Sequence, residues 1–195
     1  MLFRSEGWAT YLECLYVEHM FGYEDALKYT NGYKTKVQNR QPIIPVKGIH
    51  AEPPQDMYFK GALFLNTLRN VVNDDKRWFA VIHDLFQNFK YQTTTTEDVV
   101  QFFNKKTGMN LTPLFDQYLR YTALPRLELQ FDAAGKNVSY RWNANVKEFA
   151  MPIRVGKKGA WQIIQPTTEW QTMPTALTRD EFEVATDLYY VTVQK

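Results

Sequence analysis

The 195-residue sequence has little cysteine, little net charge and no long apolar run, and each absence excludes a class of protein. The single cysteine, Cys14, excludes an internal disulfide and a cysteine-rich metal site. The 23 basic and 21 acidic side chains give a net charge of +2, too small to favour a nucleic-acid partner or a charged membrane surface. No apolar run approaches the roughly 20 residues that cross a bilayer, so no membrane span is expected.

The chain contains enough apolar residues to form a core, and over its first 122 residues they recur with the periodicity of helices. Hydrophobic residues make up 45% of the chain and aromatic residues 15%. Ser5 is placed to cap a first helix that Gly22 ends. Helical patterns cover residues 6–21, 57–69, 75–89, 95–106 and 112–121, with a further helix in 23–39 interrupted near 31–32. The proline-rich stretch 41–55 is expected to be a loop.

The apolar side chains that recur at helical steps in this part are expected to form its core. They are Phe64, Leu65, Leu68, Trp78, Phe79, Phe86, Phe102 and Phe103.

The hydrophobic period changes after Leu124-Pro125. Residues 126–131 and 138–142 alternate strictly and are separated by a turn, which predicts a β-hairpin. Further strands are expected at 149–155, 160–165 and 188–193, with 156–159 as a tight connection. The sequence therefore predicts a multi-domain α+β fold, with a helical domain over 1–122 and a small antiparallel β-domain over 123–195.

Two short motifs stand near the starts of predicted helices. Ser5-Glu6-Gly7-Trp8-Ala9 resembles the NEGFA-type helix of the aminopeptidase N-like zinc metallopeptidases (gluzincins), and Tyr58-Phe59-Lys60-Gly61-Ala62 resembles the family's Tyr-x-Lys-Gly motif. Residues 95–98 and 114–119, followed by Leu124-Pro125, are similar to the family's closing helices and their exit. The resemblance implies the helical C-terminal half of a thermolysin-like peptidase domain, followed by a β-sandwich-like domain.

The resemblance also implies roles for three side chains. Glu6 matches the glutamate that is the third protein ligand of the zinc ion. Glu13 matches a glutamate that supports the metal site by orienting a ligating histidine. Tyr58 matches the tyrosine that donates a hydrogen bond to the oxyanion of the reaction. Lys60, by contrast, is expected to have a snorkelling or surface role and no part in the chemistry.

Each of these residues also has a purely structural interpretation. Glu6 could be a solvated carboxylate in the first turn of a helix, where the helix dipole stabilises it. Glu13 could lie on a helix surface, and Tyr58 could be an ordinary aromatic residue at the start of an apolar helix. Ser5 stands where asparagine is commoner in the family, and Trp8 where phenylalanine is frequent, but neither change removes a ligand.

The sequence lacks the other half of such a zinc site. None of His19, His50 and His83 belongs to a His-Glu-x-x-His motif, so two imidazole ligands and the general-base glutamate are absent. The chain is therefore expected to be the C-terminal part of a zinc aminopeptidase whose complete form acts on peptides. Alone it should be inactive and bind zinc weakly or not at all. It could also self-associate through the surface that the missing HExxH-bearing segment would cover.

Two alternatives to this interpretation stay open. The chain could be a self-sufficient, non-catalytic binding module that keeps the peptidase scaffold. It could instead be a family member whose site has decayed, although Glu6, Glu13 and Tyr58 are all present. Neither the compartment nor the oligomeric state follows from the sequence.

Overall fold

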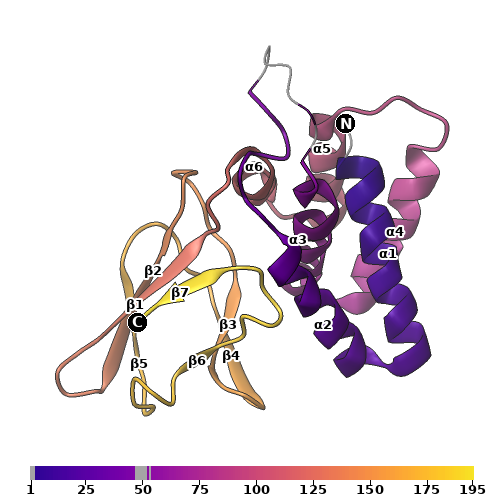
Figure 1. Ribbon diagram of the computed structural model, residues 1–195. Helices are drawn as coiled ribbons and strands as arrows, with labels where there is room; N and C mark the ends of the chain where they lie inside the picture. Colours follow the sequence, from indigo (N-terminus) through magenta and orange to yellow (C-terminus); the bar gives the residue numbers. More distant parts are fainter. Residues whose placement is uncertain (1–2, 47–51, 53) are drawn as a thin grey trace.

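The helices come first along the chain and the strands follow, in a computed structural model that describes residues 3–46, 52 and 54–195 (Figure 1). The helical part contains α1 (Phe3–Phe21), α2 (Tyr23–Gly32), the 3-10 helix η1 (Tyr33–Lys36), α3 (Asp56–Val72), α4 (Asp75–Asn88), α5 (Thr96–Thr107) and α6 (Thr112–Arg120). The strands are β1 (Arg126–Phe131), β2 (Asn137–Asn143), β3 (Ile153–Lys157), β4 (Ala160–Ile164), β5 (Gln171–Pro174), β6 (Glu183–Val184) and β7 (Thr192–Gln194). This is the α+β arrangement expected from the change of period.

Local sequence signals explain where several helices begin and end. Gly22 ends α1 with a φ of 91°, a conformation that glycine adopts without strain, and its N–H binds the Glu18 carbonyl. The Thr95 hydroxyl and the Asp98 carboxylate cap the start of α5 reciprocally. The prediction for Ser5 was wrong, because α1 already includes Phe3 and Ser5 lies within the helix.

The strands form two sheets. The four-stranded sheet has the order β5-β2-β1-β7 and the three-stranded sheet the order β4-β3-β6. The predicted hairpin is confirmed, with Leu127 opposite Trp142 and Leu129 opposite Tyr140 in antiparallel register. One pair departs from the expected antiparallel arrangement, because β7 lies parallel to β1.

Two predicted strands are displaced along the chain. The strand expected at 149–155 is β3, which begins only at Ile153, although Phe149 and Met151 are fully buried. The strand expected at 188–193 is reduced to β7, which begins at Thr192. The residues before β7 bind side chains of the helical part in place of a neighbouring strand.

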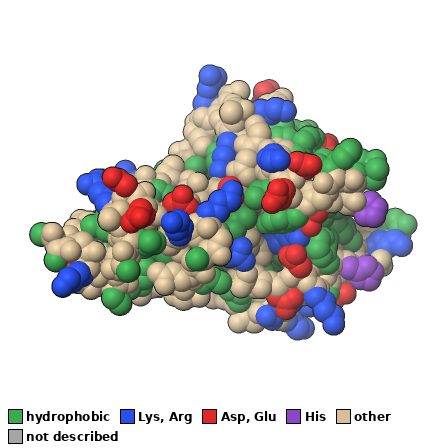
Figure 2. Space-filling model, turned by 90° about the horizontal axis from the view of Figure 1, so that it is seen from below, with side chains coloured by type: hydrophobic (Ala, Val, Ile, Leu, Met, Phe, Trp, Pro, Cys, Tyr) green, Lys and Arg blue, Asp and Glu red, His purple; other side chains and the backbone are tan. Residues whose placement is uncertain are grey.

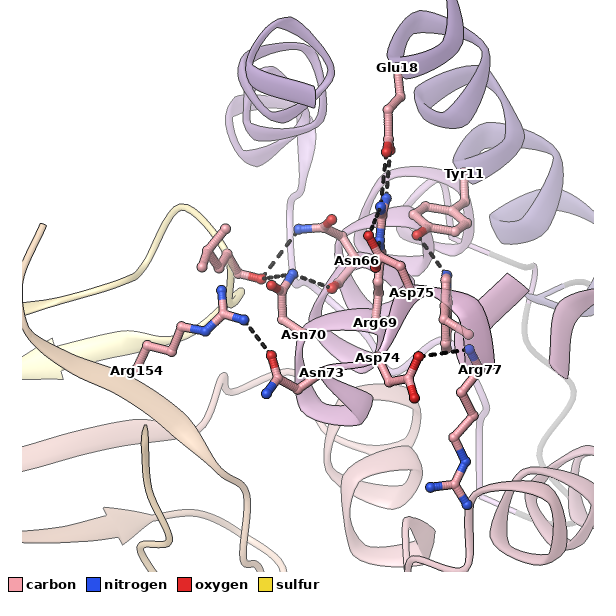
Figure 3. A network of polar contacts seen from close by, with 12 residues as sticks. Tyr11, Glu18, Asn66, Arg69, Asn70, Asn73, Asp74, Asp75, Arg77 and Arg154 are labelled. Carbon is pink, nitrogen blue, oxygen red and sulfur yellow. Dashed lines mark hydrogen bonds and ion pairs between the residues drawn. The ribbon is translucent and has the colours of Figure 1, made fainter. Parts of the chain in front are cut away.

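Those contacts join the strands to α3 (Figure 3). The side-chain amides of Asn66 and Asn70 each donate to the Leu188 carbonyl at 3.2 Å. The Tyr190 N–H donates to the Thr67 hydroxyl at 2.9 Å. Because the backbone groups of this segment are already paired, it has no need of a strand partner.

A second junction forms around the fully buried Gln117 of α6. Its amide group donates to the Ala123 carbonyl at 2.9 Å, and its carbonyl oxygen accepts from the backbone N–H groups of Asn145 and Val146 at 2.8 and 3.1 Å. One side chain thus ties α6 to the exit from the helices and to the loop after β2.

Helix α3 lies at the centre of the helical part and is buried along almost its whole length. Phe64, Leu65, Leu68, Trp78 and Phe103 are core residues, as expected, and Phe102 is partly buried against them. Phe79 and Phe86 were wrongly assigned to the core, since they are 42% and 46% exposed. Among the described residues, no helix is long and apolar enough to cross a membrane.

Candidate functional site

The two helices that carry the motif residues lie side by side and run in the same direction. Arg69, near the end of α3, forms two hydrogen bonds with the Glu18 carboxylate near the end of α1 (Figure 3). Glu6 lies 12 residues before Glu18, and 12 residues before Arg69 is Met57. Since both helices rise by about 1.5 Å per residue, Glu6 and Tyr58 lie at about the same level of the pair.

The end of this helix pair is fixed by an ionic cluster around the buried Arg69, which the sequence did not reveal. The Arg69 side chain is 5% exposed, and its guanidinium binds the Glu18 carboxylate on one side. On the other side it binds the Asp75 carboxylate of α4 with two hydrogen bonds, of 2.8 and 2.9 Å. It also lies 5.3 Å from the ring centroid of Tyr23 and 5.1 Å from that of Phe79. These contacts hold α1 and α3 in register.

The beginning of α1 is anchored by the motif residue Trp8, which is 2% exposed. Its ring stacks on Trp78 and on Phe103, with centroids 6.4 and 6.1 Å apart, and meets the Tyr11 ring edge to face. Such contacts add to the free energy that burial of these large rings provides. Trp8 thus fixes the turn that carries Glu6.

Glu6 itself lies in the first turn of α1 and is half-buried. The Thr10 hydroxyl donates to the backbone carbonyl of Glu6 at 2.9 Å, a bond within the helix. A carboxylate in the first turn is favoured by the positive end of the helix dipole. This position suits a metal ligand and a solvated glutamate equally well.

Glu13, two turns further along α1, is exposed as a residue but its carboxylate is held in place. The Tyr33 hydroxyl donates to it at 3.1 Å, and the Tyr29 hydroxyl lies 3.5 Å from the same oxygen. Burial, together with these hydrogen bonds and the nearby Cys14 and Glu13, raises the pKa of Tyr33. Tyr33 therefore stays protonated and donates to Glu13.

Tyr58 lies in the first turn of α3 and is half-buried against the core. Its ring is 6.5 Å from that of Phe59, and the Phe59 ring is 5.3 Å from that of Tyr33. Tyr58 and the carboxylate of Glu13 thus belong to one connected cluster of side chains, linked through Phe59 and Tyr33.

Lys60 is buried together with its ammonium group, so the predicted snorkelling or surface role was wrong. It is 1% exposed, and its ammonium group donates to the Tyr121 carbonyl at 2.8 Å and approaches that of Thr122 at 3.5 Å. Burial lowers the pKa of Lys60 to about 8, although the nearby charge of Asp56 acts in the opposite direction.

The described part of the chain contains no group of three or more His, Cys, Asp or Glu side chains that could hold a metal ion. His19 and His83 are both exposed, and the His83 imidazole lies 3.5 Å from the Asp84 carboxylate. His50 lies outside the described residues. The residues present therefore do not fit a complete zinc site, because Glu6 could supply only one ligand.

The chain matches a known protein family. The model of the peptidase family M1 domain matches residues 1–118, which include Glu6, Glu13 and Tyr58. The chain belongs to the M1 family of peptidases. No protein in the curated collection matches it significantly.

Two of the solved structures that match the chain illustrate its fold. Aminopeptidase A from Legionella pneumophila, determined in complex with aspartic acid, matches 100% of this chain and 24% of its own, with 14% identity and a TM-score of 0.69. A variant of the M1 zinc metallopeptidase from Deinococcus radiodurans, bound to a Tyr-Ser-Ala substrate, matches 64% of this M1 chain and 28% of its own, with 23% identity and a TM-score of 0.52. The chain thus spans about a quarter of the length of these structures.

Proposed function

We propose that this M1 chain is the C-terminal part of a zinc-dependent aminopeptidase, to which it contributes Glu6 as a metal ligand and Tyr58 as the donor to the oxyanion. The observation that supports this best is the parallel packing of α1 and α3, which brings both residues to the same level of one helix pair. The family match covers the segment that carries both residues.

The chain's own residues have separate tasks in this proposal. The Glu6 carboxylate offers an oxygen ligand at the start of α1, and the Trp8 cluster holds that turn in place. The Tyr58 phenol carries an O–H group that can donate to negative charge on a peptide carbonyl oxygen. Glu13 is held by Tyr33 and can orient a histidine supplied from outside this chain.

The remaining ligands and the general base have no counterpart in this sequence, since it has no His-Glu-x-x-His motif. In our proposal they belong to a segment upstream of this chain in the complete enzyme, which removes N-terminal residues from peptides. One carboxylate and one phenol do not hold zinc tightly, so the chain by itself should be inactive.

The test begins with the chain alone. Equilibrium dialysis against zinc, followed by metal analysis, should find far less than one ion per chain, and aminoacyl fluorogenic substrates should show no hydrolysis above background. Glu24→Ala and Tyr16→Phe are matched controls, because Glu24 also lies in the first turn of a helix and Tyr16 is exposed on α1. An aminopeptidase rate that Glu6→Ala and Tyr58→Phe abolish, while the controls keep it, would contradict the expected inactivity.

The same substitutions separate the two roles in the complete enzyme. Glu6→Ala should lose bound zinc. Tyr58→Phe should keep the zinc and lower kcat by about 10²- to 10³-fold, the usual cost of one oxyanion donor. A Tyr58→Phe enzyme with unchanged kcat would exclude this role for the phenol.

The alternative, a self-sufficient binding module, makes a different prediction about the surface. Leu12, Tyr16 and Met20 recur every four residues on α1 and are 44%, 63% and 52% exposed. Figure 2 shows hydrophobic side chains gathered over the helical part, near exposed histidine side chains. If an absent segment covers this face, the chain should self-associate with rising concentration in sedimentation experiments, and Tyr16→Lys with Met20→Lys should reduce the effect. A self-sufficient module should stay monodisperse.

A further inference from the structure

The first turn of α3, which carries Tyr58, is held by two buried charged side chains of opposite sign. Asp56 and Lys60 stand two residues before and two residues after Tyr58, and they are 2% and 1% exposed. Charged side chains are rarely buried to this extent unless they are fully paired. Each binds backbone groups of a different segment of the chain.

Asp56 binds the segment that follows the helix η1. Its two carboxylate oxygens accept the backbone N–H groups of Gln38 and Asn39 at 2.8 and 2.6 Å. Asn39 has a φ of 49°, a conformation uncommon for a residue with a side chain. The carboxylate thus fixes an unusual turn against the beginning of α3.

Lys60 binds the end of α6 from the other side. Its ammonium group donates to the carbonyl of Tyr121, the residue that follows the last turn of α6, and approaches that of Thr122. A cation is favoured there because the carbonyl groups at a helix C-terminus carry partial negative charge. Within the described part of the chain no carboxylate forms an ion pair with Lys60, so backbone carbonyls are the partners that hold it.

Tyr58 has no such anchor of its own. Within the described residues its phenol has no hydrogen-bond partner, and its ring contacts the neighbouring Phe59. The position of the phenol is therefore set by the backbone of the turn and by packing. Any change that releases this turn from the residues after α6 should move the Tyr58 side chain.

We propose that Lys60 is the positioning residue for Tyr58, because its buried ammonium group fixes the turn of α3 that carries the phenol. The catalytic meaning of that position rests on the proposed function. The conformational claim concerns this chain alone and can be tested on it. Burial also lowers the pKa of Lys60 to about 8, which makes its titration accessible in solution.

The experiment compares the wild-type chain with Lys60→Met, which keeps an unbranched side chain of similar length and removes its donors. The ring signals of Tyr58 are assigned by their absence from Tyr58→Phe. In Lys60→Met these signals should shift and the amides in the first turn of α3 should exchange with solvent about tenfold faster or more. Signals of the strands should be unchanged. Lys147→Met, at an exposed position in the loop after β2, should leave all of them as in the wild type.

Unchanged Tyr58 signals and unchanged exchange in a folded Lys60→Met chain would overturn the proposal. If this variant does not fold, the proposal is tested on the wild-type chain. The ring signals of Tyr58 are then followed from pH 7 to pH 9.5, together with the side-chain signal of Lys60. Tyr58 signals that move with the titration of Lys60 support the proposal, and signals that stay fixed while Lys60 titrates contradict it.

The proposed function and the role of Lys60 fail separately. In the complete enzyme, Lys60→Met should lower kcat toward the Tyr58→Phe value while the zinc content and KM stay unchanged. A Tyr58→Phe enzyme with wild-type kcat would remove the catalytic role of Tyr58. The tyrosine signals of the isolated chain would still decide whether Lys60 positions it.

Discussion

Lys60→Met should remove a specific part of the pH dependence of stability. The Lys60 side chain is 1% exposed and has no ionised partner in contact, and burial lowers its pKa to about 8. In the unfolded chain its pKa returns to about 10.4. Between these two values the unfolded state binds more protons than the folded state, so the free energy of unfolding rises with pH.

The size of this effect follows from the two pKa values. Below pH 8 the lysine is charged in both states, and the cost of burying its charge is fully present. Raising the pH from 7 to 9.5 relieves most of that cost, which corresponds to about 2 kcal/mol of added stability. A neutral methionine at this position has no proton to release and cannot show the gain.

Urea unfolding at pH 7 and pH 9.5, followed by tryptophan fluorescence, measures the effect as a difference between the two proteins. Other groups also contribute to the pH dependence in this range, including Cys14, whose thiol titrates there in the unfolded chain, whereas burial raises its pKa in the folded chain to about 11. They contribute equally to both proteins and cancel in the comparison. The wild type should gain about 2 kcal/mol relative to Lys60→Met between the two pH values. Equal changes in both proteins would refute the buried, unpaired state of Lys60.

Two further substitutions test the contacts that hold the helices and strands together. Glu18→Gln removes the charge of one of the two carboxylates around the buried Arg69. It should lower the free energy of unfolding, measured in urea at pH 7, by about 1–3 kcal/mol. The control Glu169→Gln, at an exposed position, should change it by less than about 0.5 kcal/mol. Gln117→Leu leaves the Ala123 carbonyl and the Asn145 and Val146 N–H groups without their partner, and should lower the free energy of unfolding by roughly 2–4 kcal/mol in the same assay. The control Gln101→Leu, on the exposed side of α5, should leave it nearly unchanged. An unchanged free energy of unfolding in Gln117→Leu would mean that these backbone groups find other partners.

The helices could be predicted from the sequence because their signals are local. Gly22 ends α1 through its own backbone freedom, and Thr95 with Asp98 caps α5 within a span of four residues. The β-hairpin could be predicted for the same reason, because its alternation and its turn are contiguous in the chain. Each of these elements depends on neighbours in sequence.

Long-range partners explain what could not be predicted. Lys60 has the polarity of a surface residue, and its partner is a backbone carbonyl 61 positions away in the sequence. The residues before β7 alternate like a strand, but side chains of α3 occupy their backbone groups. β5 and β6 were missed because four and two residues are too short to show a period.

The candidate site could be predicted in part: its residues from local motifs, but not their arrangement. Glu6, Glu13 and Tyr58 could be named from short motifs, because the sequence around them resembles motifs of the aminopeptidase N-like peptidases. Their arrangement could not be predicted from spacing, since it depends on the Arg69 cluster that sets the register of α1 and α3. Their roles in catalysis stay predictions.

The most direct test of the central proposal is to read the genomic DNA in frame upstream of the Met1 codon. The proposal predicts an open frame that encodes a His-Glu-x-x-His motif shortly before Glu6, which would supply the ligands that this sequence lacks. A stop codon in that frame, with translation starting at Met1, would contradict it and favour a free-standing protein without a catalytic zinc site.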